Sequence, residues 1–406
     1  MNASISERTL FKSKLREKFN FLFDVHSLFY YILILILTGF GFFAFALFTQ
    51  NFTTPFSGDY SQQYFAFEYN FYDDWWTFFK TGKFVFYDAN TFLGADNVIS
   101  NTYYGLFSPF TFPILLFPRE LVPQAMALMT IAKLVTGALL FRVYLKYMGV
   151  SESVARTFSI AYAFMGWTAY YLWFNNFAEV LAFFPLILFG IEKIIRDKQI
   201  WACSLGYFLM GLGNYFFLLT FGIFGVIYAG FRFFQTIKER GGWANYKDHL
   251  IVIGLGIAGF AIGYLLCAAV MIPAVMGSFG ISRATEGKYF DYLKQAISDK
   301  DFSKAAEIIF TWWHPHVVSG TEPSKYYFEF AFPLASYFYP TVSCRYVNIV
   351  GFSSFENAGS SIFFFTPCII MFCACMYRSL MKKKVSHFIA IGICVLCLFV
   401  LSVYYN

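Results

Sequence analysis

Two carboxylates lie where the chain meets the ends of apolar segments. Asp59 follows the first apolar run, directly after Gly58, and Glu179 lies in a tight polar turn between two later runs. At a membrane surface these carboxylates could act as a general base on a hydroxyl, share a divalent cation, or divide acid and base roles. The alternatives are a helix N-cap for Asp59 and a solvated turn residue for Glu179. The residues alone leave both interpretations open.

Two cationic side chains could bind a phosphate. Lys133 lies near the middle of an apolar run, where a charge costs roughly 2.5 to 3.5 kcal/mol on insertion scales. We therefore expect Lys133 to face the interior of a helix bundle, where it could contact a lipid phosphate, line a transport pathway or form a structural ion pair. Arg283 lies in a later polar segment, and its guanidinium has the planar donors that suit a phosphate.

The histidines and cysteines do not predict a metal site. His314 and His316 are separated by a single proline and lack the third ligand that a zinc site needs. Seven of the eight cysteines lie in apolar runs, where cysteine behaves as a small hydrophobic residue. A divalent cation such as Mg²⁺ or Mn²⁺, held by carboxylates, is left open as a cofactor.

The composition excludes an ordinary soluble domain. The 406 residues are 58% hydrophobic, 23% aromatic and 13% charged, whereas soluble domains are about half apolar and about one quarter charged. The net charge of +6 is too small to indicate nucleic-acid binding. We therefore predict an all-α polytopic membrane protein that contacts the lipid bilayer and no nucleic acid.

Nine apolar runs predict about nine transmembrane helices, because a helix needs about 20 residues to cross a hydrocarbon layer of about 30 Å. The runs are approximately 28–48, 121–147, 157–174, 180–195, 200–215, 216–235, 249–273, 359–377 and 386–405. Lys and Arg gather beside alternate ends of these runs, which predicts a cytoplasmic N-terminal segment 1–27. The predicted core 28–273 then contains a first outer loop at 49–122. A second outer loop at 274–358 precedes the C-terminal transmembrane helices of 359–406.

The first outer loop is predicted to contain an interfacial helix that lies flat on the membrane. Aromatic residues recur along one helical stripe and polar residues lie beside it: Phe67, Phe71, Trp75 and Phe78 against Glu68, Asp73, Asp74 and Thr77. Burial of the aromatic stripe would hold this helix at the interface, since its polar side is acidic. A Gly- and Pro-rich stretch follows at 92–118, and broken backbone at membrane depth predicts that this stretch lines a cavity.

The order of these features resembles the bacterial YfhO family, a branch of the lipid-linked-sugar glycosyltransferases with the GT-C fold. The residues that carry the resemblance are Gly58-Asp59 with Gln63, Leu93-Gly94 through Ser108-Pro109-Phe110, the short turns at Glu179 and Asn214-Tyr215, Pro185-Leu186 with Gly190-Ile191-Glu192, and Pro273 followed by Ser282-Arg283. The resemblance covers roughly residues 20–400. It implies a GT-C-like bundle whose active site lies beside the first outer loop.

The resemblance implies an enzyme of the bacterial plasma membrane with its active site on the outer face. Such an enzyme takes a sugar from a polyprenyl-phosphate carrier, such as undecaprenyl phosphate, and adds it to a cell-envelope polymer, such as a teichoic acid. Asp59 would be the catalytic base or a metal-positioning acid, and Glu179 the second acid. Arg283 and Lys133 would bind the carrier phosphate. The other implied substrate contacts are Gln63, Tyr104, and Trp75 and Trp76 beside the groove that admits the lipid.

Members of this family are longer, with more helices and a further outer domain, so the resemblance implies that this chain is a truncated member or a fragment. A transporter or flippase of a lipid-linked or small substrate is the alternative function, because Lys133 and the Gly- and Pro-rich stretch also suit a transport pathway. A non-catalytic membrane subunit is the third alternative.

Overall fold

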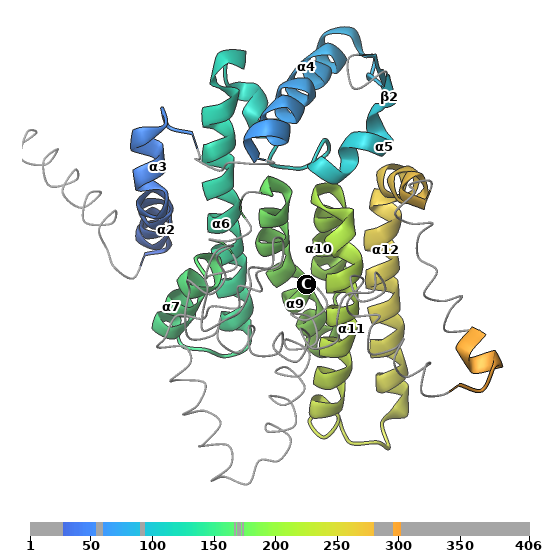
Figure 1. The fold of residues 1–406 in the computed structure, drawn as a ribbon. Coiled ribbons are helices and arrows are strands. Elements are labelled where there is room, and N and C mark those ends of the chain that lie inside the picture. The colour runs from blue at the N-terminus through green and yellow to red at the C-terminus, as the bar shows by residue number, and fades with distance from the viewer. Residues whose placement is uncertain are drawn as a thin grey trace, which may run out of the picture.

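The computed structural model describes residues 27–53, 60–89, 94–165, 168, 172, 174–279 and 295–301. In these ranges most of the chain is helical (Figure 1), and β1 (Tyr87–Asp88) pairs antiparallel with β2 (Ala95–Asp96). The α-helices are α2 (Leu28–Phe42), α3 (Ala44–Thr49), α4 (Phe65–Thr81), α5 (Asn97–Asn101), α6 (Val122–Tyr147), α7 (Glu152–Ala163), α9 (Ala178–Asp197), α10 (Trp201–Gly213), α11 (Tyr215–Thr236) and α12 (Tyr246–Phe279). Short π and 3₁₀ helices are η1 (Tyr60–Tyr64), η2 (Thr102–Tyr104), η3 (Phe112–Leu116), η4 (Arg119–Leu121) and η5 (Asn175–Phe177).

Three helical segments are long and apolar enough to cross a membrane. They are Arg119–Tyr147, which joins η4 and α6, and the segments Tyr215–Thr236 and Tyr246–Gly277 of α11 and α12. The helices α2 and α10 are apolar but shorter. The predicted helical membrane architecture is therefore confirmed for the described residues, whereas the number of nine spans stays a prediction. The predicted runs 359–377 and 386–405 lie outside the described residues.

Two helices have boundaries that differ from the predicted runs. The run 157–174 corresponds to α7, which begins earlier at Glu152 and ends at Ala163. A search for apolar residues misses its first turn, in which the Glu152 carboxylate pairs with Arg156 at 2.6 Å. The run 249–273 corresponds to α12, which continues through Pro273 to Phe279. This extension packs against α5 and so belongs to the bundle rather than to a loop.

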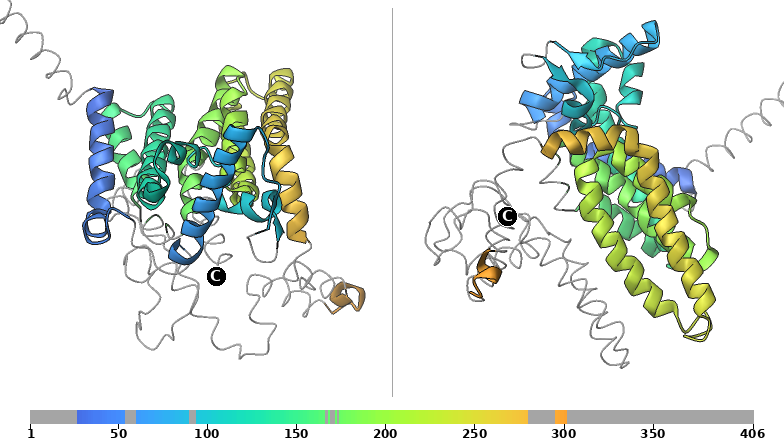
Figure 2. Two further views of the ribbon diagram at one scale, coloured as in Figure 1. Left: turned by 90° about the horizontal axis from the view of Figure 1, so that it is seen from above. Right: turned by 90° about the vertical axis from the view of Figure 1, so that its right-hand side faces the viewer.

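The helix α9 forms the centre of the bundle. Seventeen of its twenty residues are buried, and it packs against α6, α10 and α11. Figure 1 shows α6, α9, α10 and α12 side by side, with α2 beyond α6. The helices α4 and α5 lie across one end of the bundle, and the α11–α12 turn lies at the other, as the side view in Figure 2 also shows.

A charged group is buried near the C-terminal end of α9. Glu192 is fully buried and pairs with Arg232 of α11, whose Nη2 lies 2.9 Å from Oε2 of the carboxylate. The Tyr228 hydroxyl donates a hydrogen bond of 2.6 Å to Oε1 of the same carboxylate. Arg196, one turn further along α9, lies 3.3 Å from Oε2. Partners on several sides compensate the charge, as a low-dielectric interior requires.

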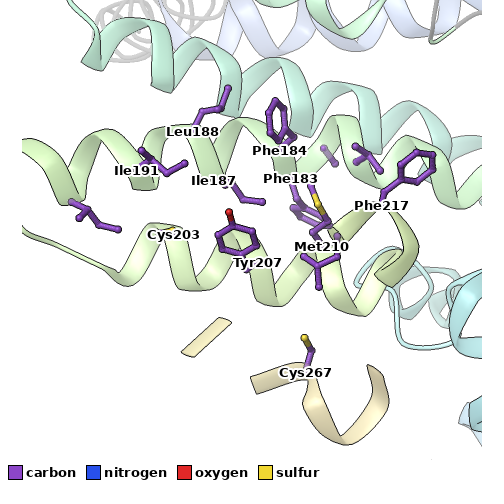
Figure 3. Packing of buried hydrophobic residues seen from close by; sticks show 14 of the residues in the cluster. Phe183, Phe184, Ile187, Leu188, Ile191, Cys203, Tyr207, Met210, Phe217 and Cys267 are labelled. Atoms are coloured by element: carbon purple, nitrogen blue, oxygen red, sulfur yellow. The ribbon is translucent and has the colours of Figure 1, made fainter. Parts of the chain in front are cut away.

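The contact between α9 and α10 depends on a glycine. Side chains such as Ile187 of α9 and Tyr207 of α10 lie between the two helices in the core cluster of Figure 3. The backbones approach so closely beside Gly190 that a Cβ atom there would lie 2.2 Å from the backbone N of Cys203. No side chain fits in that space, so only glycine permits this packing.

We expect Gly190→Ala to lower the free energy of unfolding by about 1–3 kcal/mol, because the added methyl group overpacks the α9–α10 contact. Gly254→Ala in α12 is the matched control, since no atom lies within 4 Å of the Cβ added there. Alanine favours a helix over glycine by about 1 kcal/mol, so the control should be neutral or stabilised. Thermal unfolding of the full chain in detergent measures both, and equal shifts would contradict the packing argument.

Candidate functional site

The end of the bundle beneath α4 contains a cluster of buried polar side chains, here called the Lys133 cluster. Its members come from α4, the stretch before η3, α6, η5 and the first turn of α9: Glu68, Ser108, Thr111, Thr130, Lys133, Asn175, Asn176 and Glu179. Each residue exposes at most 6% of its surface. Buried polar groups are stable only when they are hydrogen-bonded or ion-paired, so the contacts within the cluster decide what it can do.

An ion pair between Lys133 and Glu179 forms the centre of the cluster. The Lys133 Nζ lies 3.0 Å from Glu179 Oε1 and donates a hydrogen bond of 3.1 Å to the backbone carbonyl of Asn175. The Ser108 hydroxyl donates a hydrogen bond of 2.5 Å to the same Oε1. The prediction that Lys133 faces the bundle interior is confirmed, and of the three predicted roles the structure shows the ion pair. Glu179 is not a solvated turn residue, because only 1% of its surface is exposed.

The η5 turn forms hydrogen bonds to three segments that are distant from it in sequence: α6, η1 and η2. Thr130 of α6 donates a hydrogen bond of 3.1 Å to the Asn175 side chain. The Tyr64 hydroxyl of η1 donates one of 2.6 Å to Asn176 Oδ1, and Asn176 Nδ2 donates one of 2.6 Å to the carbonyl of Tyr103. These side-chain bonds hold the non-helical backbone of η5 in place and bring it to the start of α9.

The second oxygen of Glu179 faces the end of α10. A Cβ atom on Gly213 would lie 2.0 Å from Glu179 Oε2, so glycine is required beside the carboxylate. The next residue, Asn214, caps α11 through a bond of 3.2 Å from Phe217 N to its Oδ1. Glu179 Oε2 and Asn214 Nδ2 are buried and have no hydrogen-bond partner among the residues that the structure describes. Such atoms cost about 1–3 kcal/mol each and are available to a ligand group or water.

Glu68 belongs to the Lys133 cluster but is not among the site residues that the sequence predicts. The sequence pattern places it on the polar side of an interfacial helix, and this prediction is wrong, because Glu68 shares the buried side of α4 with Phe71 and Trp75. Burial raises the pKa of Glu68 to about 7, against the opposing effects of Lys133 and of a hydrogen bond with Thr111; Glu179 raises it further. Its Oε1 has no hydrogen-bond partner within the described ranges. The signal in the sequence was the 68, 71, 75 spacing, an i, i+3, i+7 stripe.

Asp59 and Arg283, two of the predicted site residues, lie outside the described residues. The residue after Asp59, Tyr60, is fully buried against Val122 and Met126 of α6. Tyr64, four residues further on, is bonded to Asn176. The chain that follows Asp59 is therefore anchored beside the Lys133 cluster.

The predicted aromatic contacts fall into different environments. Trp75 is a core residue, whose Nε1 donates a hydrogen bond of 2.9 Å to the carbonyl of Leu106. It fixes α4 onto the Gly- and Pro-rich stretch, and its predicted place beside a lipid groove stays a prediction. Trp76 is 36% exposed, and Tyr104 packs on Phe67 at a ring distance of 4.3 Å. Gln63 is partly buried in η1, so its substrate role, like those of Trp76 and Tyr104, stays a prediction.

The Gly- and Pro-rich stretch is buried in protein where it meets the cluster. Thr111 donates a hydrogen bond of 3.0 Å to the carbonyl of Gly105, and Ser108 bonds Glu179. Broken backbone at membrane depth is tolerated in such surroundings. Among the described residues no group of three or more His, Cys, Asp and Glu side chains could hold a metal ion, so the divalent cation stays a prediction. His314 and His316 lie outside the described residues.

We expect Lys133→Met to destabilise the protein by about 3–5 kcal/mol, because it leaves the buried Glu179 carboxylate without its counter-charge. Lys133→Met combined with Glu179→Gln should recover much of this loss, since both charges are then gone. Arg119→Met is the control: its ion pair with Asp73 is about half exposed, and such pairs contribute at most about 1 kcal/mol. Unfolding in detergent measures all three, and a double variant no more stable than Lys133→Met would contradict the pairing.

The raised pKa of Glu68 predicts a pH-dependent stability. A carboxyl group whose pKa rises from 4.5 to about 7 on folding binds its proton more tightly in the folded state. Relative to Glu68→Gln, protonated Glu68 therefore stabilises the folded protein by about 3 kcal/mol below pH 4.5. This stabilisation is lost as the pH rises through about 7. Thermal unfolding of both proteins from pH 4 to 8 checks this. Burial also raises the pKa of Asp74 to about 6. Because Asp74 titrates in both proteins, its contribution cancels from the difference between their stabilities. A difference that does not change with pH would rule out a buried proton on Glu68.

Comparisons with known proteins fit this architecture. Residues 29–304 match the family described as "Bacterial membrane protein YfhO". The chain is also similar to the "Uncharacterized protein YfhO" of Bacillus subtilis (strain 168), with 27% identity over 164 residues. That match covers 39% of this chain and 17% of the length of the Bacillus protein. No solved structure matches the chain. Because the family match extends over more than half of the sequence, the chain belongs to the YfhO family of bacterial membrane proteins.

Proposed function

We propose that the chain is the membrane core of a glycosyltransferase that moves a sugar from a polyprenyl-phosphate carrier to a cell-envelope polymer, such as a teichoic acid, on the outer face of the bacterial plasma membrane. The observation that carries this proposal is the Lys133 cluster. It combines a buried ion pair with two carboxylate oxygens, on Glu68 and Glu179, that lack partners among the described residues. Unsatisfied acceptors at the end of a helix bundle suit the hydroxyl groups of a sugar.

The proposed reaction is an inverting displacement. The acceptor hydroxyl attacks the anomeric carbon, the bond from that carbon to the phosphate oxygen breaks, and the lipid phosphate leaves with the electron pair. Asp59 takes the acceptor proton as general base. Arg283 stabilises the departing phosphate. A divalent cation such as Mg²⁺ or Mn²⁺, if held by Asp59, would supply further positive charge beside that phosphate. Gln63, Tyr104 and Trp76 contact the sugar or its carrier.

In this proposal Glu179 and Lys133 act together as positioning residues. Lys133 holds Glu179 rather than the carrier phosphate, because its ammonium group already contacts the carboxylate and the carbonyl of Asn175. Glu179 Oε1 is occupied by Lys133 and Ser108, which leaves Oε2 to accept a hydrogen bond from a sugar hydroxyl. Supporting contacts of this kind fix a functional group in one geometry.

The proposed orientation places the α4 end of the bundle outside and the α11–α12 turn in the cytoplasm. The turn and the start of α12 carry Lys238, Arg240 and Lys247, and the last turns of α9 carry Lys193 and Arg196. Lys and Arg favour the cytoplasmic side of membrane helices. The charge distribution therefore supports an outward-facing Lys133 cluster.

A transporter or flippase is the second candidate, favoured by the buried charges of Lys133 and Glu192, since such charges also mark substrate pathways. The two functions differ in their products. A glycosyltransferase in detergent forms a glycosidic bond without any membrane to cross, whereas a flippase moves its substrate across liposomes and forms no bond.

Asp59→Asn and Glu179→Gln should each reduce sugar transfer by about 10²-fold or more, the typical contribution of a catalytic base or of precise positioning. Mass spectrometry of cell-envelope polymers measures the sugar decoration in cells that carry each variant, the intact gene or a deletion. Asp73→Asn is the control, because this acid lies on the exposed side of the same outer region and should leave decoration unchanged. Full decoration by a normally expressed Asp59→Asn protein would remove Asp59 from the mechanism.

A further inference from the structure

The end of the bundle opposite the Lys133 cluster contains a cavity of about 360 Å³. It lies between the C-terminal end of α9, the turn after α11 and the first turn of α12. Its charged lining consists of Arg196, Lys198, Glu239, Arg240 and Asp248. The volume falls within the roughly 300–1,000 Å³ of typical small-molecule sites.

Arg240 has one donor without a partner among the described residues. Its Nη1 lies 3.2 Å from Asp248, and its Nη2 donates a hydrogen bond of 3.3 Å to the carbonyl of Phe233. Its Nε is buried and has no partner in the part of the chain that the structure describes. An unsatisfied donor of this kind is costly. The guanidinium that carries it lines the cavity, where an anionic oxygen would compensate its positive charge.

The remaining lining makes the cavity positive. Arg196 contacts Glu192 at 3.3 Å and the thioether of Met148 at 3.7 Å, and a guanidinium with five N–H donors retains others for a ligand. Lys198 shares Asp248 with Arg240, at 2.7 Å. Three basic side chains thus face two acids, Asp248 and Glu239. Lys238 and Lys247 are exposed, and each is next in sequence to a lining residue, so they add positive charge to this end of the bundle.

Exposed aromatic residues place the cavity at the depth of lipid headgroups. Trp243 and Tyr246, on the chain between Arg240 and Asp248, are 68% and 59% exposed. Trp201 and Phe234 are also exposed at this end. Trp and Tyr gather where a membrane meets water, and α11 and α12, which lead to this turn, are apolar enough to span the bilayer.

We propose that this cavity binds the phosphate group of an anionic phospholipid from the adjoining leaflet. Basic pockets between membrane helices are known to hold such headgroups. The guanidinium groups of Arg196 and Arg240 contact the phosphate oxygens through charge-assisted hydrogen bonds, and Asp248 keeps its two basic partners. A lipid rather than free phosphate is the occupant because the cavity lies beside the exposed aromatic residues of the membrane interface. This site is separate from the proposed catalytic site and does not depend on its function.

Native mass spectrometry of the detergent-purified full chain tests the proposal. We expect phosphatidylglycerol to remain bound and to raise the thermal unfolding temperature, and phosphatidylcholine and inorganic phosphate to do neither at equal concentration. Arg196→Gln with Arg240→Gln should weaken phosphatidylglycerol binding at least about ten-fold, as expected for loss of one charge-assisted hydrogen bond. Arg240→Lys should also weaken it, because lysine keeps the charge but lacks the planar donors of a guanidinium.

Lys238→Gln with Lys247→Gln is the matched control, since it removes the same charge from this end of the bundle and leaves the lining of the cavity intact. Equal loss of lipid in this control and in the arginine variant would overturn the proposal, as would stabilisation by inorganic phosphate alone. Arg196→Gln serves as a second variant if loss of Arg240 impairs folding, because Arg196 is substantially exposed. Unchanged lipid retention by a folded Arg196→Gln protein, and by Arg240→Lys, would likewise exclude the site.

Discussion

The ion pair between Lys133 and Glu179 is the interaction on which the α4 end of the bundle depends. Either charge alone in this interior would cost several kcal/mol, so each residue requires the other. Lys133 comes from the middle of α6 and Glu179 from the first turn of α9. Their 3.0 Å contact therefore determines the position of α9 relative to α6 along the helix axes. The Ser108 hydrogen bond to the same oxygen then draws the Gly- and Pro-rich stretch to that point.

The positions of α4 and η1 follow from this arrangement. The helix α4 buries Glu68, Phe71 and Trp75 on one side, so it covers the ion pair with a third ionisable group and fastens itself to Leu106 through the indole of Trp75. The η1 helix is held by Tyr64 through Asn176. Several segments that are distant in sequence thus converge on one small volume. Such dense support is what fixes functional groups within a narrow range of positions.

The sequence predicts those features that depend on hydropathy and on the cost of a buried charge. The apolar runs locate α6, α10, α11 and α12 within a few residues, apart from the C-terminal extension of α12, and the position of Lys133 within its run predicts an interior lysine, which the ion pair confirms. The sequence does not identify Glu68 as buried, because two neighbouring stripes of α4 share Phe71 and Trp75, and only tertiary contacts with η3 and α6 select between the stripes. The roles of Asn176 and Gly213 depend on tertiary contacts with distant residues, which no local pattern contains.

The buried charges of α9 also constrain how the protein can move. One acid in its first turn is neutralised from α6, and another near its end, Glu192, is neutralised by Arg232 of α11. Sliding α9 by one turn, about 5.4 Å, or rotating it about its axis would separate both pairs at once, and Gly190 leaves no room against α10. The central helix is therefore held in one position by an ion pair near each end. Any conformational change of the bundle must therefore be made by the elements around α9.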